Sequence, residues 1–190
     1  NEWARRALKF ASEALQADRG VVLEAVMQDG RALEWASEAL RDDRDVVLEA
    51  VKHYGEFKIN KWGHALWDED GDALKFASER LKEDHDVVLA AVKENAWALR
   101  HASPLLRADR DFMLKAVKEN VGVLRHAGLE DLRADRDFML KAVKENGHAL
   151  AYASEDLKAD RAVVDKAVKQ NMDAYAYASE ALQAELDAEF

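Results

Sequence analysis

The sequence predicts an all-α fold: an α-solenoid of about seven two-helix repeats, interrupted by one 16-residue insertion. Three observations support this prediction. The 190 residues include one Pro and 8 Gly, and strong helix formers such as Ala, Leu, Glu and Lys dominate the composition. A motif of Ala, Leu, any residue, an aromatic residue, Ala and Ser recurs along the chain. An Asp-Arg pair recurs in step with it, and two anchors in step indicate a true structural period.

The repeats define one expected domain. They start near residues 7, 32, 73, 98, 123, 149 and 174, and residues 57–72 form the insertion. A unit of this length cannot bury its own apolar face, so neighbouring units must stack and share a core. We therefore expect residues 1–190 to form a single helical-repeat array.

The first helix of each repeat carries the Ala-Leu motif. In the segment Arg31 to Ser37, Ala32, Leu33 and Ala36 recur at the spacing of a buried helical stripe. The Ser that ends the motif has two interpretations. It is either the N-cap of a short turn, such as Glu38 to Arg41, or a small residue that permits close contact between helices.

The second helix of each repeat begins at the Asp of the Asp-Arg pair, because Asp accepts hydrogen bonds from the unpaired N–H groups of a first helical turn. We expect it to end near Gly30, Gly55 or Gly147, since Gly adopts the left-handed conformation that often terminates a helix. Asn takes the neighbouring position in other repeats and predicts the same ending. These residues are Asn95, Asn120, Asn146 and Asn171.

The two ends of the chain differ from its middle. Asp165 occupies the position that Leu23 and Leu48 fill in their repeats. A polar end is typical of a capping repeat and equally fits a truncation before a further helix. The chain opens with Asn1-Glu2-Trp3, without an initiator Met or a signal-peptide pattern, so we expect a portion of something longer.

The residue types that are missing argue against catalysis. The chain has no Cys and no Thr, and its Ser residues all occupy the same repeat position. A hydroxyl that recurs once per repeat is structural by default, so no residue stands out as a nucleophile. We expect no enzyme activity, no catalytic residue and no cofactor. The Ser residues are Ser12, Ser37, Ser78, Ser103, Ser154 and Ser179.

Charge and hydropathy narrow the class of partner. The net charge of −10 repels phosphate backbones, so we expect no nucleic-acid partner. No apolar run approaches the roughly 18 residues of a membrane span, although peripheral attachment to a membrane complex stays compatible with the sequence. We expect a soluble protein, intracellular or organellar, and the compartment stays open.

The insertion is the most individual part of the chain. It contains Phe57, Trp62 and Trp67, followed by an acidic run. Aromatic residues on a loop that interrupts an array are good anchors for a protein partner. The alternative is that these rings fill the gap where stacking is interrupted, because an exposed Trp is unfavourable.

Two features invite a metal-binding interpretation, and neither supports it. With the glycine of the acidic run 68–72 at loop position six, Leu66 and Ala77 fall at the essential ends of an EF-hand loop. His101 and His126 share one position in adjacent repeats, about 10 Å apart if layers stack. That separation is too large for one zinc ion. Aromatic residues take this position elsewhere, so we expect ring packing and no metal site.

The repeats resemble a known family. Residues 7–30, ALKFASEALQADRGVVLEAVMQDG, and residues 98–122, ALRHASPLLRADRDFMLKAVKENVG, are similar to the tandem repeats of the domain of unknown function family 4116. The resemblance covers almost the whole chain outside residues 57–72, with departures at Pro104 and at an added residue near Gly128. It implies a helical array of a kind common in unicellular algae and other protists. It implies no established activity and no functional residue to carry over.

The sequence therefore favours a non-catalytic helical-repeat scaffold that mediates protein–protein interaction. The alternative is a structural accessory subunit, held permanently in a large assembly, for which an algal organelle is one candidate. An accessory subunit has large, apolar, permanent contacts, whereas a free scaffold is monomeric in solution. No motif identifies the partner protein.

Overall fold

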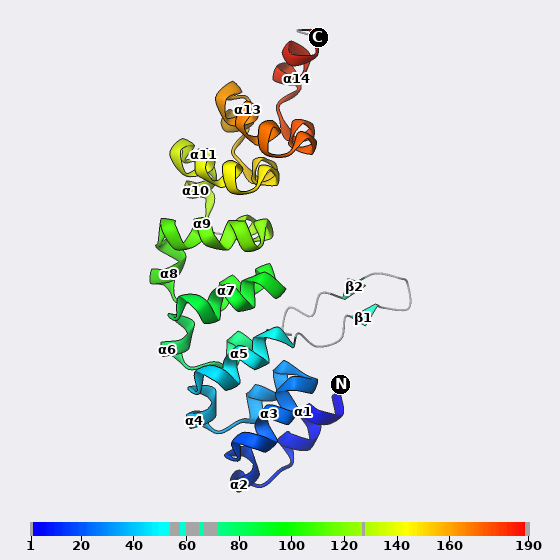
Figure 1. Ribbon diagram of the computed structural model, residues 1–190, viewed down its shortest axis with the longest axis vertical. Coiled ribbons are helices and arrows are strands. Elements are labelled where there is room, and N and C mark those ends of the chain that lie inside the picture. The colour runs from blue at the N-terminus through cyan, green and yellow to red at the C-terminus, as the bar shows by residue number, and fades with distance from the viewer. Residues whose placement is uncertain (1, 54–57, 60–64, 67–71, 127, 189–190) are drawn as a thin grey trace. The chain divides into compact units, whose positions relative to one another are not determined.

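The computed structural model describes residues 2–53, 58–59, 65–66, 72–126 and 128–188. They form an all-α repeat fold, as predicted, and the chain divides into two compact units, Asn1–Arg107 and Ala108–Phe190 (Figure 1). Within each unit, consecutive repeats of short helices pack on one another.

Unit 1 starts with the first repeat, which consists of α1 (Glu2–Lys9), α2 (Glu13–Gln16) and α3 (Arg19–Gln28). The later repeats begin with a 3₁₀ helix, labelled η. In order they are η1 (Gly30–Trp35), α4 (Glu38–Arg41) and α5 (Arg44–Lys52), then η2 (Ala73–Phe76), α6 (Glu79–Lys82) and α7 (His85–Glu94), then η3 (Ala96–His101) and α8 (Pro104–Ala108) at the boundary.

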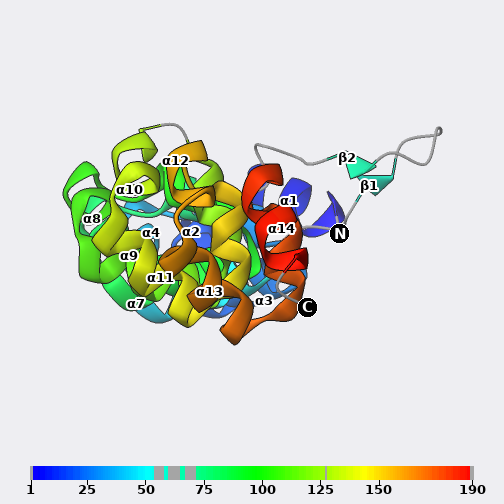
Figure 2. The same ribbon diagram turned by 90° about the horizontal axis from the view of Figure 1, so that it is seen from above.

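Unit 2 continues the same order of segments. Its elements are α9 (Arg110–Glu119), η4 (Val121–Arg125), α10 (Glu130–Ala134), α11 (Arg136–Glu145), η5 (Gly147–Tyr152), α12 (Glu155–Lys158), α13 (Arg161–Gln170), η6 (Met172–Tyr177) and α14 (Glu180–Asp187). Figure 2 shows the long helices α9, α11 and α13 on one side of this unit and the short helices α10 and α12 on the other.

An internal repeat has three helical segments, one more than the two that the sequence predicts. The Ala-Leu motif forms a 3₁₀ helix, as in η1, and not the first helix expected over Arg31 to Ser37. Asp29 caps the start of η1, and the backbone of Ala36 is already extended. A segment this short suits the tighter 3₁₀ helix, which occurs mainly in short pieces.

The recurring Ser is the N-cap of the short α-helix, which was the first of its two interpretations. Its hydroxyl oxygen accepts a hydrogen bond from the N–H three residues later, at 3.2–3.4 Å, although Ser37 makes no such bond. Pro104 is the first residue of α8, where its missing N–H costs nothing. The capping residues are Ser12, Ser78, Ser103, Ser154 and Ser179.

The long helices end near the predicted residues, as α3 does at Gln28 and α11 at Glu145, but the left-handed conformation predicted for these endings is wrong. In the described part of the chain only Gly128 has a positive φ, 85°, so Gly30 and Gly147 are not left-handed; Gly55 lies outside the described residues. The four Asn residues have φ between −145° and −154°, which is extended backbone. Each caps the following 3₁₀ helix instead, as Asn95 does by accepting a hydrogen bond from the Trp97 N–H at 3.0 Å.

The core lies between consecutive repeats. In the second repeat Ala32, Leu33, Val46 and Val47 are completely buried. The long helix of one repeat packs on the long helix of the next, as α3 does on α5 and α11 on α13. Burial of these apolar side chains supplies the main stabilisation of the stack, about 25 cal/mol per Å² removed from water.

A backbone hydrogen bond also joins neighbouring repeats. The N–H of the capping Ser donates to a carbonyl near the end of the short helix in the preceding repeat, at 2.9–3.0 Å. The Ser side chain therefore caps the short helix of its own repeat, and the Ser N–H holds this repeat against the preceding one. The donor and acceptor residues are Ser37 and Gln16, Ser78 and Arg41, Ser103 and Lys82, Ser154 and Arg133, and Ser179 and Lys158.

The Arg of the Asp-Arg pair reaches the next repeat. Arg19 Nε lies 2.9 Å from a carboxylate oxygen of Asp43, and Arg44 Nε lies 2.9 Å from one of Asp84. The receiving Asp is the N-cap of the next long helix, so one carboxylate caps its helix and binds the preceding repeat. Unit 2 repeats this contact between Arg110 and Asp135, and between Arg136 and Asp160.

Replacing Arg44 by Met is expected to lower the free energy of unfolding at neutral pH. It is also expected to reduce the amount by which this free energy falls on acidification. Burial raises the pKa of Asp84, but the hydrogen bond and charge of Arg44, together with the capping N–H groups of Val87 and Asp86, outweigh it and hold this pKa below its usual value. A lowered pKa stabilises the fold above the ordinary pKa of Asp, and this contribution disappears as pH falls through the folded-state pKa. Because the pair is only half-buried and remains accessible to water, the effect is modest and shrinks in high salt.

Urea unfolding at neutral and acid pH, in low and high salt, measures this contribution. The unchanged protein should lose more stability on acidification than the Met variant. Equal losses in the two proteins would show that the Arg–Asp contact does not hold the repeats together.

The insertion carries one short antiparallel pair, β1 (Lys58–Ile59) and β2 (Ala65–Leu66), with Lys58 opposite Leu66 and Ile59 opposite Ala65. The sequence predicted no strand here, and two residues per strand leave the fold class unchanged. Within the described residues, no helix has the length and apolar character that crossing a membrane requires.

Candidate interaction surface

The first repeat exposes residues whose equivalents are buried in most later repeats. Val21 on α3 is 38% exposed, whereas its equivalents are at most 1% exposed. Within each unit the preceding long helix packs on the helix that carries this position, as α3 does on α5 and α11 on α13. The buried equivalents are Val46, Val87, Phe112, Phe138 and Val163.

Leu15 on α2 shows the same contrast. It is 47% exposed, while five of its equivalents are at most 8% exposed. Ala7 on α1 is also exposed, although Ala or Val at this position is buried in all later repeats. Thus one side of the first repeat is an uncovered stacking face. The buried equivalents of Leu15 are Leu40, Leu81, Leu106, Leu157 and Leu182.

These residues line a groove of about 450 Å³ between α1 and α3. Most of its lining is apolar, with Leu8 and Ala25 at the base and Trp3, 78% exposed, at the side. Among the described residues, the polar side chains that line it are Glu24 and Gln28. We call this surface, made by Trp3, Ala4, Ala7, Leu8, Ala11, Leu15, Val21, Glu24, Ala25 and Gln28, the first-repeat face.

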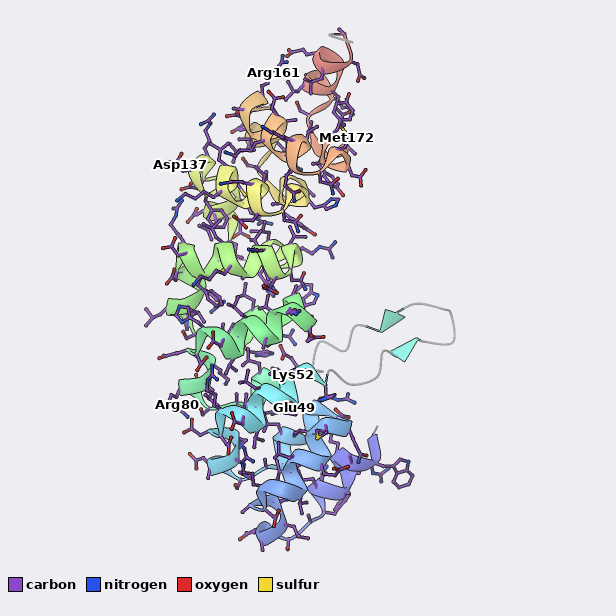
Figure 3. All side chains as sticks on the ribbon, in the orientation of Figure 1. Glu49, Lys52, Arg80, Asp137, Arg161 and Met172 are labelled. Carbon is purple, nitrogen blue, oxygen red and sulfur yellow. The ribbon has the colours of Figure 1, made fainter. Side chains whose placement is uncertain are left out.

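Helix α3 carries a further departure from the repeat pattern. Met27 is exposed at a position where the other long helices have Lys, such as Lys52 on α5 (Figure 3). Lys52 makes an ion pair with Glu49, 3.1 Å away, and Met27 has no charge with which to do so. At this position α3 therefore carries an apolar side chain where the other long helices carry a charge. The other Lys residues are Lys93, Lys118, Lys144 and Lys169.

Two polar groups on the same side of the first repeat also lack the partner that their equivalents have. The N–H of Ser12 has no acceptor among the described residues, whereas later Ser N–H groups bind the preceding repeat. Asp18 accepts a hydrogen bond from the Val21 N–H at 3.0 Å, but no Arg of the described residues forms an ion pair with it. Asp43 and Asp84 each bind an Arg in addition to capping their helices.

The predicted partner-binding residues cannot be compared with this face. Phe57, Trp62 and Trp67 lie outside the described residues, so the hypothesis that they anchor a partner stays a prediction. The alternative, that they fill a gap in the stack, stays equally open.

The chemistry available elsewhere is structural. No group of three or more His, Asp or Glu side chains in the described ranges is arranged to hold a metal ion. His101 accepts a hydrogen bond from Arg100 at 3.0 Å, and His126 is buried. The recurring ring position is half-buried in most repeats, with Lys9 4.8 Å from the Trp35 ring centre in one of them. These arrangements fit ring packing.

The match to known families agrees with the repeat geometry. The family model described as a domain of unknown function, DUF4116, matches residues 5–41, 18–61, 68–107, 86–133 and 135–183. The chain belongs to the DUF4116 family. No curated protein and no solved structure matches it. Family membership therefore accounts for the repeated core of this DUF4116 chain and leaves its function to be argued from its surfaces.

Sequence reasoning missed the first-repeat face of this DUF4116 chain. Leu15 and Val21 match the repeat pattern, so nothing in their identity distinguishes them from buried residues. Two signals were available. Met27 interrupts a series of Lys residues at an exposed position, and Trp3 lies before the recurring Ala-Leu motif of the first repeat.

Proposed function

We propose that this DUF4116 chain is a non-catalytic scaffold that binds a protein partner through its first-repeat face. The single observation that carries the proposal is the exposure of Leu15 and Val21, since five equivalents of each are at most 8% exposed. Water in contact with such a surface is unfavourable, and a partner that covers it gains the burial energy.

The shape and composition of the face support a protein partner. It combines an exposed Trp with Leu, Val and Ala, and large apolar patches on soluble proteins commonly mark protein interaction sites. Trp is also among the residues that most often dominate binding energy at interfaces. Glu24 and Gln28 are too few to provide the convergent polar groups that position a reacting substrate.

Affinity capture from the native source tests the proposal. Leu15→Lys introduces a charge into the first-repeat face and is expected to reduce capture of a specific partner at least about tenfold, since burying an unpaired charge costs more than the about 1.4 kcal/mol that corresponds to this factor. Leu105→Lys is the matched control, because Leu105 is also an exposed Leu of unit 1 and does not line the face.

Capture should survive in the Leu105 variant and fail in the Leu15 variant, with the helical circular dichroism of both unchanged. If both variants retain every partner of the unchanged protein, the first-repeat face is not the binding surface.

The apolar character of the face also favours the alternative of a permanent accessory subunit, such as one in an algal organelle. Obligate interfaces are larger and more hydrophobic than transient ones. The dissociation rate separates the two functions. An accessory subunit should remain bound through prolonged washing, whereas a scaffold should exchange with labelled free protein.

A further inference from the structure

A row of lysines crosses the long helices of unit 2. Lys115 on α9, Lys141 on α11 and Lys166 on α13 occupy the same position in consecutive repeats, and all three are exposed. The three helices pack on one another in this order, and Figure 1 shows them one after another along unit 2. We call these three residues the Lys row. It shares no residue with the first-repeat face, so a function for it does not depend on the proposed function.

The repeat fold does not require a lysine at this position. Glu24, Glu49 and Ala90 occupy it in the long helices of unit 1, and all three are good helix formers. The helix dipole favours a Lys in the last turn of a helix, but this effect is confined to that turn and does not reach the Lys row. It accounts instead for the lysines that recur in the last turn, Lys118, Lys144 and Lys169.

The ammonium groups of the Lys row are not used within the part of the chain that the structure describes. None of the three forms an ion pair there, whereas the neighbouring Lys118 lies 3.8 Å from a carboxylate oxygen of Glu145. The chain as a whole carries a net charge of −10, so a cationic row is a local exception. An acidic partner is therefore attracted to the Lys row and repelled by the net charge of the chain, which orients its approach.

The spacing of the Lys row favours a helical partner. Packed helices lie about 8–10 Å apart, so equivalent residues of α9, α11 and α13 recur at about this interval. Carboxylates on every seventh residue of an α-helix lie on nearly the same face and recur at about 10.5 Å. Residues on one face of an extended strand recur at about 6.6 Å or 13 Å, and neither interval matches.

Carboxylates on both sides of the Lys row argue against a phosphate backbone as the partner. Asp111 and Glu119 lie one turn before and one turn after Lys115 on α9, and both are exposed. Asp137 and Glu145 repeat this arrangement on α11. A nucleic acid or an anionic membrane presents closely spaced phosphates, which these carboxylates repel. A helix with widely spaced carboxylates contacts the lysines without meeting them.

A cleft beside the Lys row provides an apolar contact for such a helix. It has a volume of about 440 Å³, lies between α9 and α11, and is lined by Leu114, Phe138 and Lys141 together with mostly charged residues. Leu114 is half-buried, so part of its side chain is open to a partner. An apolar residue next to the middle carboxylate of the partner helix can pack on Leu114 while that carboxylate binds Lys141.

We propose that the Lys row binds an acidic α-helix of a partner protein. The helix crosses α9, α11 and α13, and its carboxylates, seven residues apart, each bind one lysine of the row. The chain then has two docking surfaces of different chemistry, since the first-repeat face is apolar and the Lys row selects a partner by charge.

Fluorescence anisotropy with the whole chain and two synthetic helical peptides tests the spacing. One peptide carries three Glu residues seven positions apart on a helix of Ala and Gln, with one Leu next to the middle Glu. The other has the same composition with the three Glu in succession. At low ionic strength the first peptide is expected to bind at least about tenfold more tightly, because only it can contact all three lysines at once. Equal affinities, or binding of neither peptide, would overturn the proposal.

Charge reversal in the protein tests the residues. Lys115→Glu, Lys141→Glu and Lys166→Glu together are expected to lower the affinity for the spaced peptide at least about tenfold. Glu24 and Glu49 show that a long helix accepts Glu at this position, so circular dichroism should not change. The matched control replaces the same three lysines by Arg, which keeps the charge and should keep the binding. Loss of binding in the Arg variant as well, or retention in the Glu variant, would contradict the proposal.

Two further measurements separate this inference from the alternatives. Leu15→Lys should leave the affinity for the spaced peptide unchanged, so failure of the proposed function and failure of this inference are distinguishable. Duplex DNA and phosphatidylserine vesicles are tested in parallel with the peptide. If either binds more tightly than the spaced peptide and is lost in the Glu variant, the Lys row binds phosphate groups and the proposal of an acidic helix is wrong.

Discussion

Replacing Gly30 by Ala is expected to destabilise unit 1 by about 3 kcal/mol or more, the largest effect of a single methyl group that we predict for this protein. A Cβ built at Gly30 would lie 2.0 Å from the Ala50 carbonyl oxygen and 2.7 Å from that of His53. Both obstacles are backbone, so η1 and the end of α5 would have to separate. The separation would also break the hydrogen bond from the Gly30 N–H to the His53 carbonyl, 2.8 Å in the structure. Urea unfolding measures the loss.

The same substitution at Gly20 is the matched control and should have the opposite sign. Gly20 lies in the first turn of α3, where a Cβ would meet only the end of the Asp18 side chain, at 3.3 Å. Ala162 occupies the equivalent position in α13, so the site accepts a methyl group. Gly20→Ala is expected to stabilise the protein by about 0.5–1 kcal/mol. Equal effects at the two glycines would contradict the close approach at Gly30.

Replacing Asp72 by Asn is expected to stabilise the protein at neutral pH by about 1–2 kcal/mol. Asp72 is buried and caps η2 by accepting a hydrogen bond from the Leu74 N–H at 3.0 Å, but its second carboxylate oxygen has no hydrogen-bond partner among the described residues. Burial raises the pKa of Asp72 to about 6, and the Leu74 N–H bond and the charge of Arg100 only partly oppose this. Asn keeps the capping oxygen without the charge, as Asn95 does for η3.

The stabilisation should depend on pH in a defined direction. Between the ordinary pKa of Asp, 3.8, and about 6, the folded protein holds a proton that the unfolded chain has released. The free energy of unfolding therefore falls as pH rises through this window, and the Asn variant should lack this fall. Thermal or urea unfolding as a function of pH measures it. A gain from Asn that is equal at acid and neutral pH would contradict a buried, charged Asp72.

The repeat pattern made the fold predictable because each buried position recurs many times in one chain. The Asp anchor identified the start of every long helix, and the Ala-Leu motif identified the buried stripe, as Ala32 and Leu33 confirm. The 3₁₀ form of that stripe was not predictable. It depends on the short interval between the Asp29 cap and the next N-cap region, and helical periodicity does not distinguish the two helix types over one or two turns.

Features that depend on how closely two particular repeats approach each other could not be predicted from the sequence either. Ala96 is the equivalent of Gly30 and carries a methyl group, so the pattern gave no reason to regard Gly30 as required. The long helix was expected to end at a left-handed Gly or Asn because both residues favour that conformation. Instead the Asn side chain caps the next 3₁₀ helix, which needs an extended backbone at that residue.

The first-repeat face illustrates the same limit for function. Burial of a repeat residue is a property of its neighbours, so Val21 and Val46 have the same sequence context and opposite exposure. Only the packing of α3 on α5, with no described element on its other side at Val21, distinguishes them. The aromatic residues of the insertion were predicted as a binding site because they differ from the repeat pattern. The first-repeat face consists mostly of residues that match this pattern.

Site-specific photocrosslinking tests the central claim, that the first-repeat face binds a protein, most directly. A photoreactive residue replaces Leu15 in one variant and Leu105 in another, and each is irradiated in an extract of the native source. We predict a discrete protein adduct from position 15 and none from position 105. Equal adducts from both positions, or an adduct from position 105 alone, would contradict the assignment of this face as the binding surface.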